Sequence, residues 1–169
     1  MAEIIKVIAD VIQAEMELPN NRVYLYNQKW VIPPDQNLFV VVGFISAKPF
    51  GVRGGYANDP ITNELVEVQS LNQQETYSID VISRDSSARQ RKQEVILALN
   101  STRMQQAMEQ YNFKIGNLPT SFLDVSAVEA AALLNRYRLA FNALVIYRKT
   151  KSTEYYDSFS VPPDIITNP

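Results

Sequence analysis

The sequence contains neither cysteine nor histidine. The absence of cysteine excludes disulfides, thiolate metal ligands and cysteine nucleophiles, and it fits a reducing compartment. The absence of histidine removes the side chain that most often acts as a general acid or base near neutral pH, and with it the usual hydrolytic triad. We therefore predict that the protein is not an enzyme and that it uses no catalytic residue, cofactor or metal.

Glycine and long hydrophobic runs are scarce too. Three of the five glycines lie within residues 51–55, but this cluster lacks the spacing and the strand-to-helix setting of a nucleotide-binding loop. The longest apolar runs, Leu38–Val42 and Ala130–Leu134, are far shorter than the roughly 20 residues that cross a bilayer. Charged residues interrupt Met1–Leu18, where a signal peptide needs an apolar core. We expect no membrane segment and no export by that route.

No sign of charge dominates the chain. A formal net charge of −2 gives no whole-chain case for binding nucleic acid, although a local basic patch is compatible with it. The 169 residues, 46% hydrophobic and 20% charged, are typical of one globular domain. We predict a single domain at residues 1–160 and an extended tail at residues 161–169, where the apolar content is low.

The first 18 residues predict an amphipathic helix. Apolar residues recur at helical spacing from Ile4 to Leu18, and charged or amide side chains occupy the other side. Pro19 and the two asparagines after it end the pattern. Because the polar side is acidic rather than basic, we expect the apolar stripe to pack on a sheet and not on a membrane surface.

Four further segments have the character of strands. Arg22–Tyr26 predicts a short strand, and Leu38–Ser46 can pair as a hairpin with the end of Leu65–Ser83. Ala47–Leu65, which contains the glycine cluster, predicts a long loop that projects at the hairpin tip. Arg136–Tyr147 has an apolar residue at every second position and predicts a central strand.

The middle of the chain predicts two helices. Ser87 and Gln90 match a capping box at the start of a helix that continues to Leu99, and helical spacing resumes from Met104 to Tyr111. This order of elements predicts an α+β fold with a mixed, mainly antiparallel sheet, packed by an N-terminal helix and a central helix pair. The remaining predictions are a turn at Lys114–Pro119, a strand at Ser121–Ser126, a helical turn or loop at Val128–Leu134 and an extended stretch at Thr153–Phe159.

Carboxylates are the remaining material for cation binding or catalysis. Asp80 with Asp85, or Glu64 with Glu67, could hold a hard cation or act as a pair. On its strand, however, Asp80 lies on the side opposite the apolar residues, where a solvated or interface carboxylate is the ordinary expectation. We assign none of the four to a catalytic role.

The second half of the chain carries several segments in a defined order: Glu75–Val81 leading into the charged helix Ala88–Leu99, the Asn117–Pro119 turn with Leu123–Asp124, and Arg136–Phe141 leading to Tyr155–Phe159. This arrangement resembles a family of bacteriophage neck and tail-terminator proteins, also described as tail completion proteins. The family also has an N-terminal helix of the kind predicted for this chain, whereas the tail after residue 161 shows no pattern that matches the family.

The resemblance implies a structural virion protein, assembled in the host cytoplasm, whose small α+β domain closes into a ring, usually six-fold. Such a ring sits at the head-proximal end of a phage tail, ends tube growth and joins the tail to the neck. The implied partners are further copies of the chain, the tail tube protein and a neck or connector protein. Aromatic and arginine side chains are common at interface hot spots, with ordinary intrachain packing as the competing explanation. The interface candidates are Lys48, Phe50, Arg53 and Tyr56 in the predicted loop, and Tyr155, Tyr156 and Phe159 near the end.

An alternative hypothesis is a head-completion or connector protein of the neck, whose basic channel contacts passing DNA without sequence specificity. The first candidates are Arg89, Arg91 and Lys92, for which a solvated helix face or a carboxylate partner is the ordinary explanation. The other cations that could line this channel are Arg136, Arg138, Arg148, Lys149 and Lys151.

A carboxylate-based metal enzyme is a third hypothesis.

Overall fold

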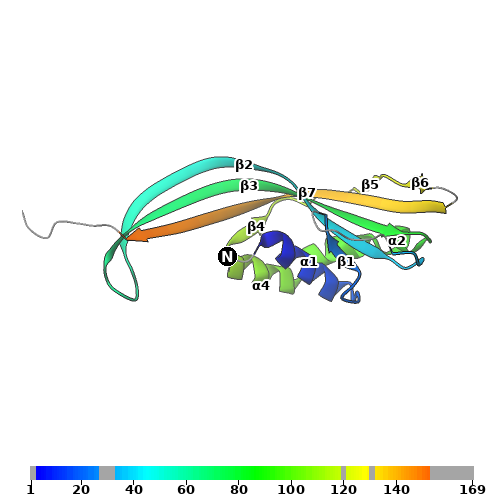
Figure 1. Ribbon diagram of the computed structural model, residues 1–169, viewed down its shortest axis with the longest axis horizontal. Coiled ribbons are helices and arrows are strands. Elements are labelled where there is room, and N and C mark those ends of the chain that lie inside the picture. The colour runs from blue at the N-terminus through cyan, green and yellow to red at the C-terminus, as the bar shows by residue number, and fades with distance from the viewer. Residues whose placement is uncertain (1–2, 27–32, 119–120, 130–131, 153–169) are drawn as a thin grey trace, which may run out of the picture.

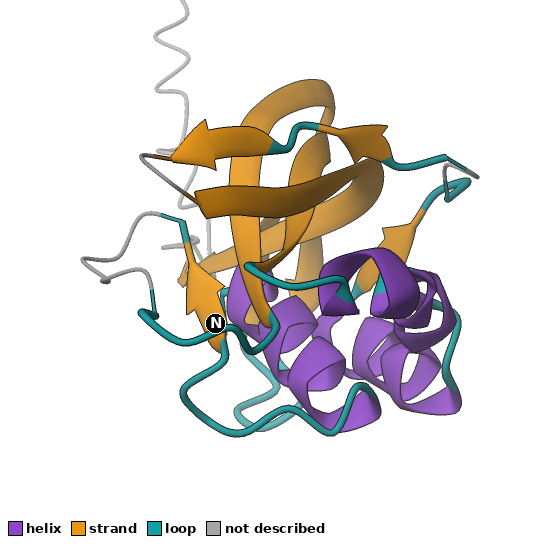
Figure 2. Ribbon diagram, turned by 90° about the vertical axis from the view of Figure 1, so that its right-hand side faces the viewer, coloured by secondary structure: helices purple, strands orange, loops and turns teal. Residues whose placement is uncertain are grey.

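The computed structural model describes residues 3–26, 33–118, 121–129 and 132–152. The elements form two layers, a long sheet and a group of helices that cover one face of it (Figures 1 and 2). The predicted α+β class, with a mixed and mostly antiparallel sheet packed by an N-terminal helix and a central helix pair, is confirmed.

Helix α1, Ile4–Glu15, is the amphipathic helix that the sequence predicts. Its apolar stripe enters the main core, where Ile8 and Ile12 are fully buried. Burial of each such side chain contributes about 1.5–3 kcal/mol, so packing on the sheet and not helix propensity holds α1 in place. None of the helices in the described part of the chain has the length and apolarity that a membrane span requires.

Five strands lie side by side in the order β1-β2-β3-β7-β4. Among the strands of the described residues, β1 and β2 are the one parallel pair, and β5 and β6 pair separately with β7. The predicted hairpin is confirmed, since Phe39 pairs with Ile82 and Phe44 with Tyr77. The strands are β1 Val23–Leu25, β2 Phe39–Asn58, β3 Leu65–Ser83, β4 Phe113–Ile115, β5 Leu123–Asp124, β6 Ala127–Glu129 and β7 Ala132–Ser152.

The central helices are α2 Ser87–Arg91, α3 Gln93–Leu99 and α4 Thr102–Tyr111, so the first predicted helix is divided in two. The predicted capping box is wrong. Ser87 lies inside α2, and the carboxylate of Asp85 accepts a hydrogen bond from the Ser87 amide at 2.9 Å, which satisfies one of the free amides at the helix start.

Two cores lie on opposite faces of the sheet, because successive strand residues point to opposite sides. The main core joins alternate residues of β2, β3 and β7, such as Val42, Ile79 and Leu139, to α1, α3 and α4. The smaller core lies on the other face near the start of β2, and it consists of Phe39, Val41, Ile82 and Leu134.

The largest correction concerns Ala47–Leu65, which is not a long loop. β2 continues to Asn58, β3 begins at Leu65, and a turn at residues 59–64 joins them. Glycine and proline are accommodated because the pairing shifts register twice, between Phe44 and Ser46 and between Pro49 and Gly51.

Two smaller predictions also differ from the structure. In Val128–Leu134, predicted as a helical turn or loop, the described residues belong to β6 and β7, which pair with each other. Lys114 and Ile115 of the predicted turn belong to β4. The predicted strand at Arg136–Tyr147 is confirmed and is longer, because β3 offers a partner along the whole of Ala132–Ser152 except its first residues. Thr153–Phe159 and the tail at 161–169 lie outside the described residues.

Candidate functional site

The most distinctive part of the molecule is a ribbon of three strands that extends beyond the helices (Figure 1). We call this ribbon the arm and define it as residues 46–74 and 146–152. It contains the second part of β2, the first part of β3 and the end of β7, which stay paired along their length. Tyr147, at the base of the arm, packs against the main core. No helix in the described ranges lies under the rest of the arm, so both faces of that part are open.

Strand register assigns each arm residue to one of two faces. Residues that are direct partners on neighbouring strands share a face. Val52, Leu71 and Tyr147 form one such row, and they continue the face that the helices cover. We call this the inner face. Arg53, Ser70 and Arg148 form the next row on the opposite side, which we call the outer face.

The inner face of the arm exposes apolar side chains to solvent. Val52 is 77% exposed and Tyr56 is 71% exposed, and Leu71 is half-buried between neighbours. A shallow, mainly apolar groove of about 350 Å³ lies here, lined by Val52, Leu71, Tyr147 and Lys149 among others. Apolar groups that are held in a strand and left in water indicate a surface that another molecule covers.

The edges of the arm are unsuited to adding a further strand. Beyond Val42, β2 has no second partner strand among the described residues, and beyond Val145 the same holds for β7. The β2 edge carries Pro49 and both register shifts, and the β7 edge carries a run of cations. Proline, bulges and lysine at an edge oppose strand pairing, so a partner meets the arm through its faces.

The predicted interface residues Lys48, Phe50, Arg53 and Tyr56 all lie exposed on β2 of the arm. The structure does not bring them to one face. Tyr56 is on the inner face, Lys48 and Arg53 are on the outer face, and Phe50 falls at the second register shift. The other candidates, Tyr155, Tyr156 and Phe159, lie outside the described residues.

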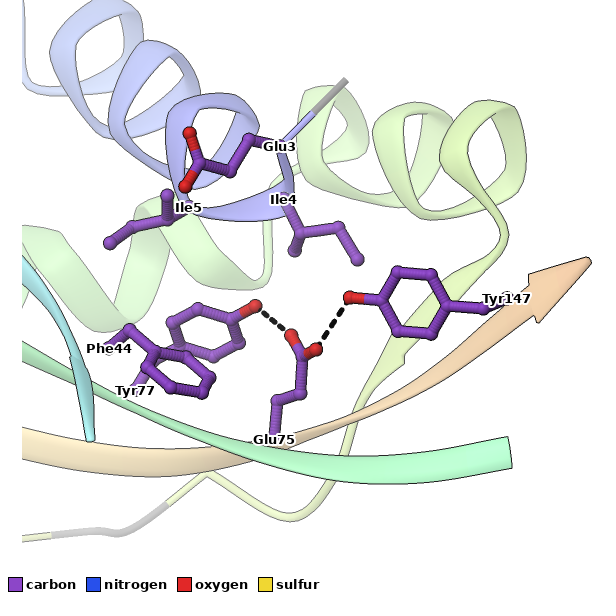
Figure 3. Close-up of a pocket in the computed structure, with 7 residues that line it drawn as sticks. All are labelled: Glu3, Ile4, Ile5, Phe44, Glu75, Tyr77 and Tyr147. Atoms are coloured by element: carbon purple, nitrogen blue, oxygen red, sulfur yellow. Dashed lines mark hydrogen bonds between the residues drawn. The ribbon is translucent and has the colours of Figure 1, made fainter. Parts of the chain in front are cut away.

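A buried carboxylate lies where the arm joins the body (Figure 3). Glu75 is only 4% exposed and accepts hydrogen bonds from the hydroxyl of Tyr77, from the hydroxyl of Tyr147 at 2.6 Å and from the amide of Gln73 at 2.6 Å. It faces a pocket of about 370 Å³ beneath the start of α1, with Glu3, Ile4, Ile5 and Phe44 as the other lining residues.

The two tyrosines of this cluster remain protonated at physiological pH. Burial raises the pKa of Tyr77 well above its ordinary value, and the hydrogen bond to Glu75 and the charge of Glu75 raise it further. The pKa of Tyr147 is raised for the same reasons, burial first. Both hydroxyls therefore stay donors to Glu75, and the bond from Tyr147 connects β7 to β3 at the base of the arm.

Sequence reasoning missed Glu75 and Tyr147. One signal was present: Glu75 has the same parity as Tyr77, Ile79 and Val81, which places a carboxylate on the core face of the strand. The partner could not be read from the sequence, since Tyr147 is 72 residues away.

The sequence predicts a solvated or interface carboxylate at Asp80, but in the structure Asp80 is buried within the chain. It is 2% exposed on the outer side of β3, where Arg138 binds it at 2.7 and 2.9 Å and Arg136 binds it through one nitrogen. The hydrogen bond to Asp80 is the main reason that the pKa of Arg138 is raised. Both arginines lie beside Asp80 because β7 pairs with β3. The sequence of either strand alone does not show this pairing.

Two of the predicted channel cations, Arg91 of α2 and Lys92 between α2 and α3, have contacts within the chain. Arg91 binds the carboxylate of Glu94 at 2.6 Å and the carbonyl oxygen of Met16 at 2.7 Å. The ammonium group of Lys92 lies 4.2 Å from the ring centre of Tyr137, a cation–π contact. Arg89 is exposed. The structure therefore does not present these three as one solvent-facing row.

The other carboxylate candidates do not form a pair. Asp85 serves the start of α2, and the hydrogen bonds from Ser87 lower the pKa of its carboxyl group. Glu67 lies on the inner face of the arm and accepts a hydrogen bond from Gln69 at 2.7 Å, while Glu64 belongs to the turn at the tip.

No protein-family model matches this chain, and no curated protein matches it.

Proposed function

We propose that this protein is a structural component of a phage virion that forms a ring at the head-proximal end of a tail, ends tube growth and joins the tail to the neck. The observation that carries the proposal is the arm, which holds exposed apolar side chains on a three-stranded ribbon away from the body. The resemblance of the sequence to neck and tail-terminator proteins supports the same assignment.

The geometry suits a contact between successive copies. An arm on one side of the body meets a different surface of the next copy, which is a head-to-tail contact, and such contacts close into rings when the rotation allows. The inner face supplies the apolar area, and the exposed Tyr56 and Val52 are anchors of the kind found at hot spots. The proposed partners are further copies of this chain, in a homohexamer, together with the tail tube protein and a neck or connector protein.

The first test is the solution mass of the purified chain, measured by light scattering across a concentration series, with and without tail tube protein. A mass near six times the 19.2 kDa subunit is the expected result. A chain that remains a monomer at high concentration and does not associate with tubes would contradict the proposal.

A pair of variants locates the contact. Val52→Gln with Tyr56→Gln removes apolar area from the inner face and should lower the mass at a fixed concentration. The matched control is Leu97→Gln with Leu123→Gln, which changes two exposed apolar residues of the body and should leave the mass unchanged. Equal effects of the two pairs would rule out the arm as the contact.

The alternative proposal, a head-completion or connector protein that contacts DNA, shares the ring and differs in its partner. Arg91 and Lys92 are engaged in contacts within the chain, so the cations at residues 89–92 give this alternative little support. A different set of cations, on the outer face of the arm, favours contact with DNA.

A further inference from the structure

The outer face of the three long strands carries an excess of cations. Its charged residues outside the ion pair of Asp80, Arg136 and Arg138 are Lys48, Arg53 and Arg148, and all three are exposed. Lys114 of β4 joins this face because it pairs with Leu144. Among the described residues of β2, β3, β4 and β7, Asp80 is the one carboxylate on this face, and two arginines already bind it.

These cations form two cross-strand rows. Arg53 and Arg148 flank Ser70 in one row, so their Cα atoms lie about 10 Å apart, two strand spacings. Lys48 and Lys114 occupy the two ends of a second row, which also contains Gln74 and Leu144. The rows place positive charge on both sides of the central strand.

The central strand between the rows is uncharged and polar. On the outer face, β3 presents Ser70, Asn72 and Gln74, all of which can donate hydrogen bonds. Gly55 on β2 is part of the same face, and nothing lies within 4 Å of where its Cβ would be, so no bulky side chain blocks access there. The result is a polar lane on β3 with lysine and arginine on both sides of it, next to the exposed Leu144 and Ile146 of β7.

We infer that the outer face of the arm binds the sugar–phosphate backbone of double-stranded DNA. Phosphates are the anions that pair with arginine and lysine in rows, and serine, asparagine and glutamine donate hydrogen bonds to them. On β7 the two rows lie four residues apart, at Leu144 and Arg148, which is about 13 Å and matches about four base pairs of duplex. The contact carries no sequence preference, because it reaches no base edge.

The inner face does not fit the same ligand. Its cations, Lys149 and Lys151, share the face with the carboxylate of Glu67, which is the cross-strand partner of Lys151. Duplex DNA favours the face that has cations and polar donors without free carboxylates. The inference concerns a surface of the single chain and does not depend on the proposed ring.

The experiment measures binding of the full chain to two 30-base-pair duplexes of unrelated sequence, by fluorescence anisotropy between 50 and 200 mM salt. Equal affinity for both duplexes, falling steeply with salt, is the expected result. Arg53→Gln with Arg148→Gln should weaken binding about tenfold or more at 50 mM salt and reduce the slope of log affinity against log salt by about 2.

The control has the same change of charge on the same ribbon. Lys149→Gln with Lys151→Gln removes two cations from β7 on the inner face and should keep most of the affinity and the slope. Both pairs are exposed, and light scattering reports separately whether assembly changes. Equal losses from the two pairs, a strong preference for one duplex or no binding at 50 mM salt would overturn the inference. The inference would also be overturned if Arg53→Gln with Arg148→Gln abolished binding to tail tube protein and left DNA binding unchanged.

Discussion

At the scale of single residues, the two buried carboxylates of the described residues, Glu75 and Asp80, are each held by at least one partner that is distant in the sequence. Glu75 receives its hydrogen bonds from two tyrosines and a glutamine, and Asp80 binds two arginines of β7. A buried carboxylate costs free energy unless such partners satisfy it. Both clusters connect β3 to β7, so they fix the alignment of the two longest strands of the sheet.

Replacing Glu75 with alanine should destabilise the fold. The change leaves the hydroxyl of Tyr77, which lies in the core, without its acceptor, and an unsatisfied buried donor costs about 1–3 kcal/mol. We expect urea denaturation to show a free energy of unfolding lower by about 2–3 kcal/mol.

Glu67→Ala is the matched control for this change. Glu67 lies on the same strand and the same face, but its hydrogen bond comes from the exposed Gln69. The free energy of unfolding of this variant should lie within about 0.5 kcal/mol of the wild-type value. If Glu75→Ala left stability unchanged or raised it, the desolvation of the carboxylate would outweigh its hydrogen bonds.

At the scale of elements, short helices depend on their ends. α2 has only five residues, too few to be stable by hydrogen bonding within the helix. The carboxylate of Asp85 accepts from both the amide and the hydroxyl of Ser87, and Ser83 donates to the carbonyl oxygen of Asp85. The start of α2 is therefore tied to the end of β3 through Asp85.

The contribution of Asp85 should depend on pH. Because hydrogen bonds from Ser87 lower the pKa of Asp85 in the folded chain, its stabilisation is complete above its unfolded pKa of about 4 and is lost as pH falls through the folded value. At pH 7, Asp85→Ala should reduce the free energy of unfolding by about 1 kcal/mol. In urea denaturation the difference between variant and wild type should shrink below pH 4. The same comparison for Glu109→Ala, on the exposed side of α4, should show no loss at pH 7, and a constant difference for Asp85→Ala across pH would contradict the assignment.

At the scale of the whole molecule, stability and assembly are assigned to different parts. No residue between Phe44 and Gln74 belongs to the main core, which α1, α3 and α4 form with the other part of the sheet. The arm is thus a folded extension whose exposed groups the body does not need. This division supports the proposal that the inner face meets another copy and the outer face meets DNA.

Shortening the arm should separate these roles. Replacing Arg53–Ser70 with Asn-Gly joins Val52 to Leu71, which are cross-strand partners, through a two-residue hairpin turn. We expect circular dichroism to show cooperative thermal unfolding of the body, because the main core is unchanged, and light scattering to show a monomer. Loss of cooperative unfolding would mean that the arm is part of the folding unit, and an unchanged oligomer would place the contact elsewhere.

The sequence by itself determined the amphipathic helix, the alternation of β7 and the α+β order of elements, because each depends on periodicity within one segment. It failed at Ala47–Leu65, where glycine and proline indicate a loop, because two register shifts let β2 pair with β3 to its end. Only the tertiary structure decided that Arg53 and Arg148 share a face and that Glu75 meets Tyr147. Those relations depend on the register between strands far apart in the chain, where a shift of one residue moves every side chain to the opposite face.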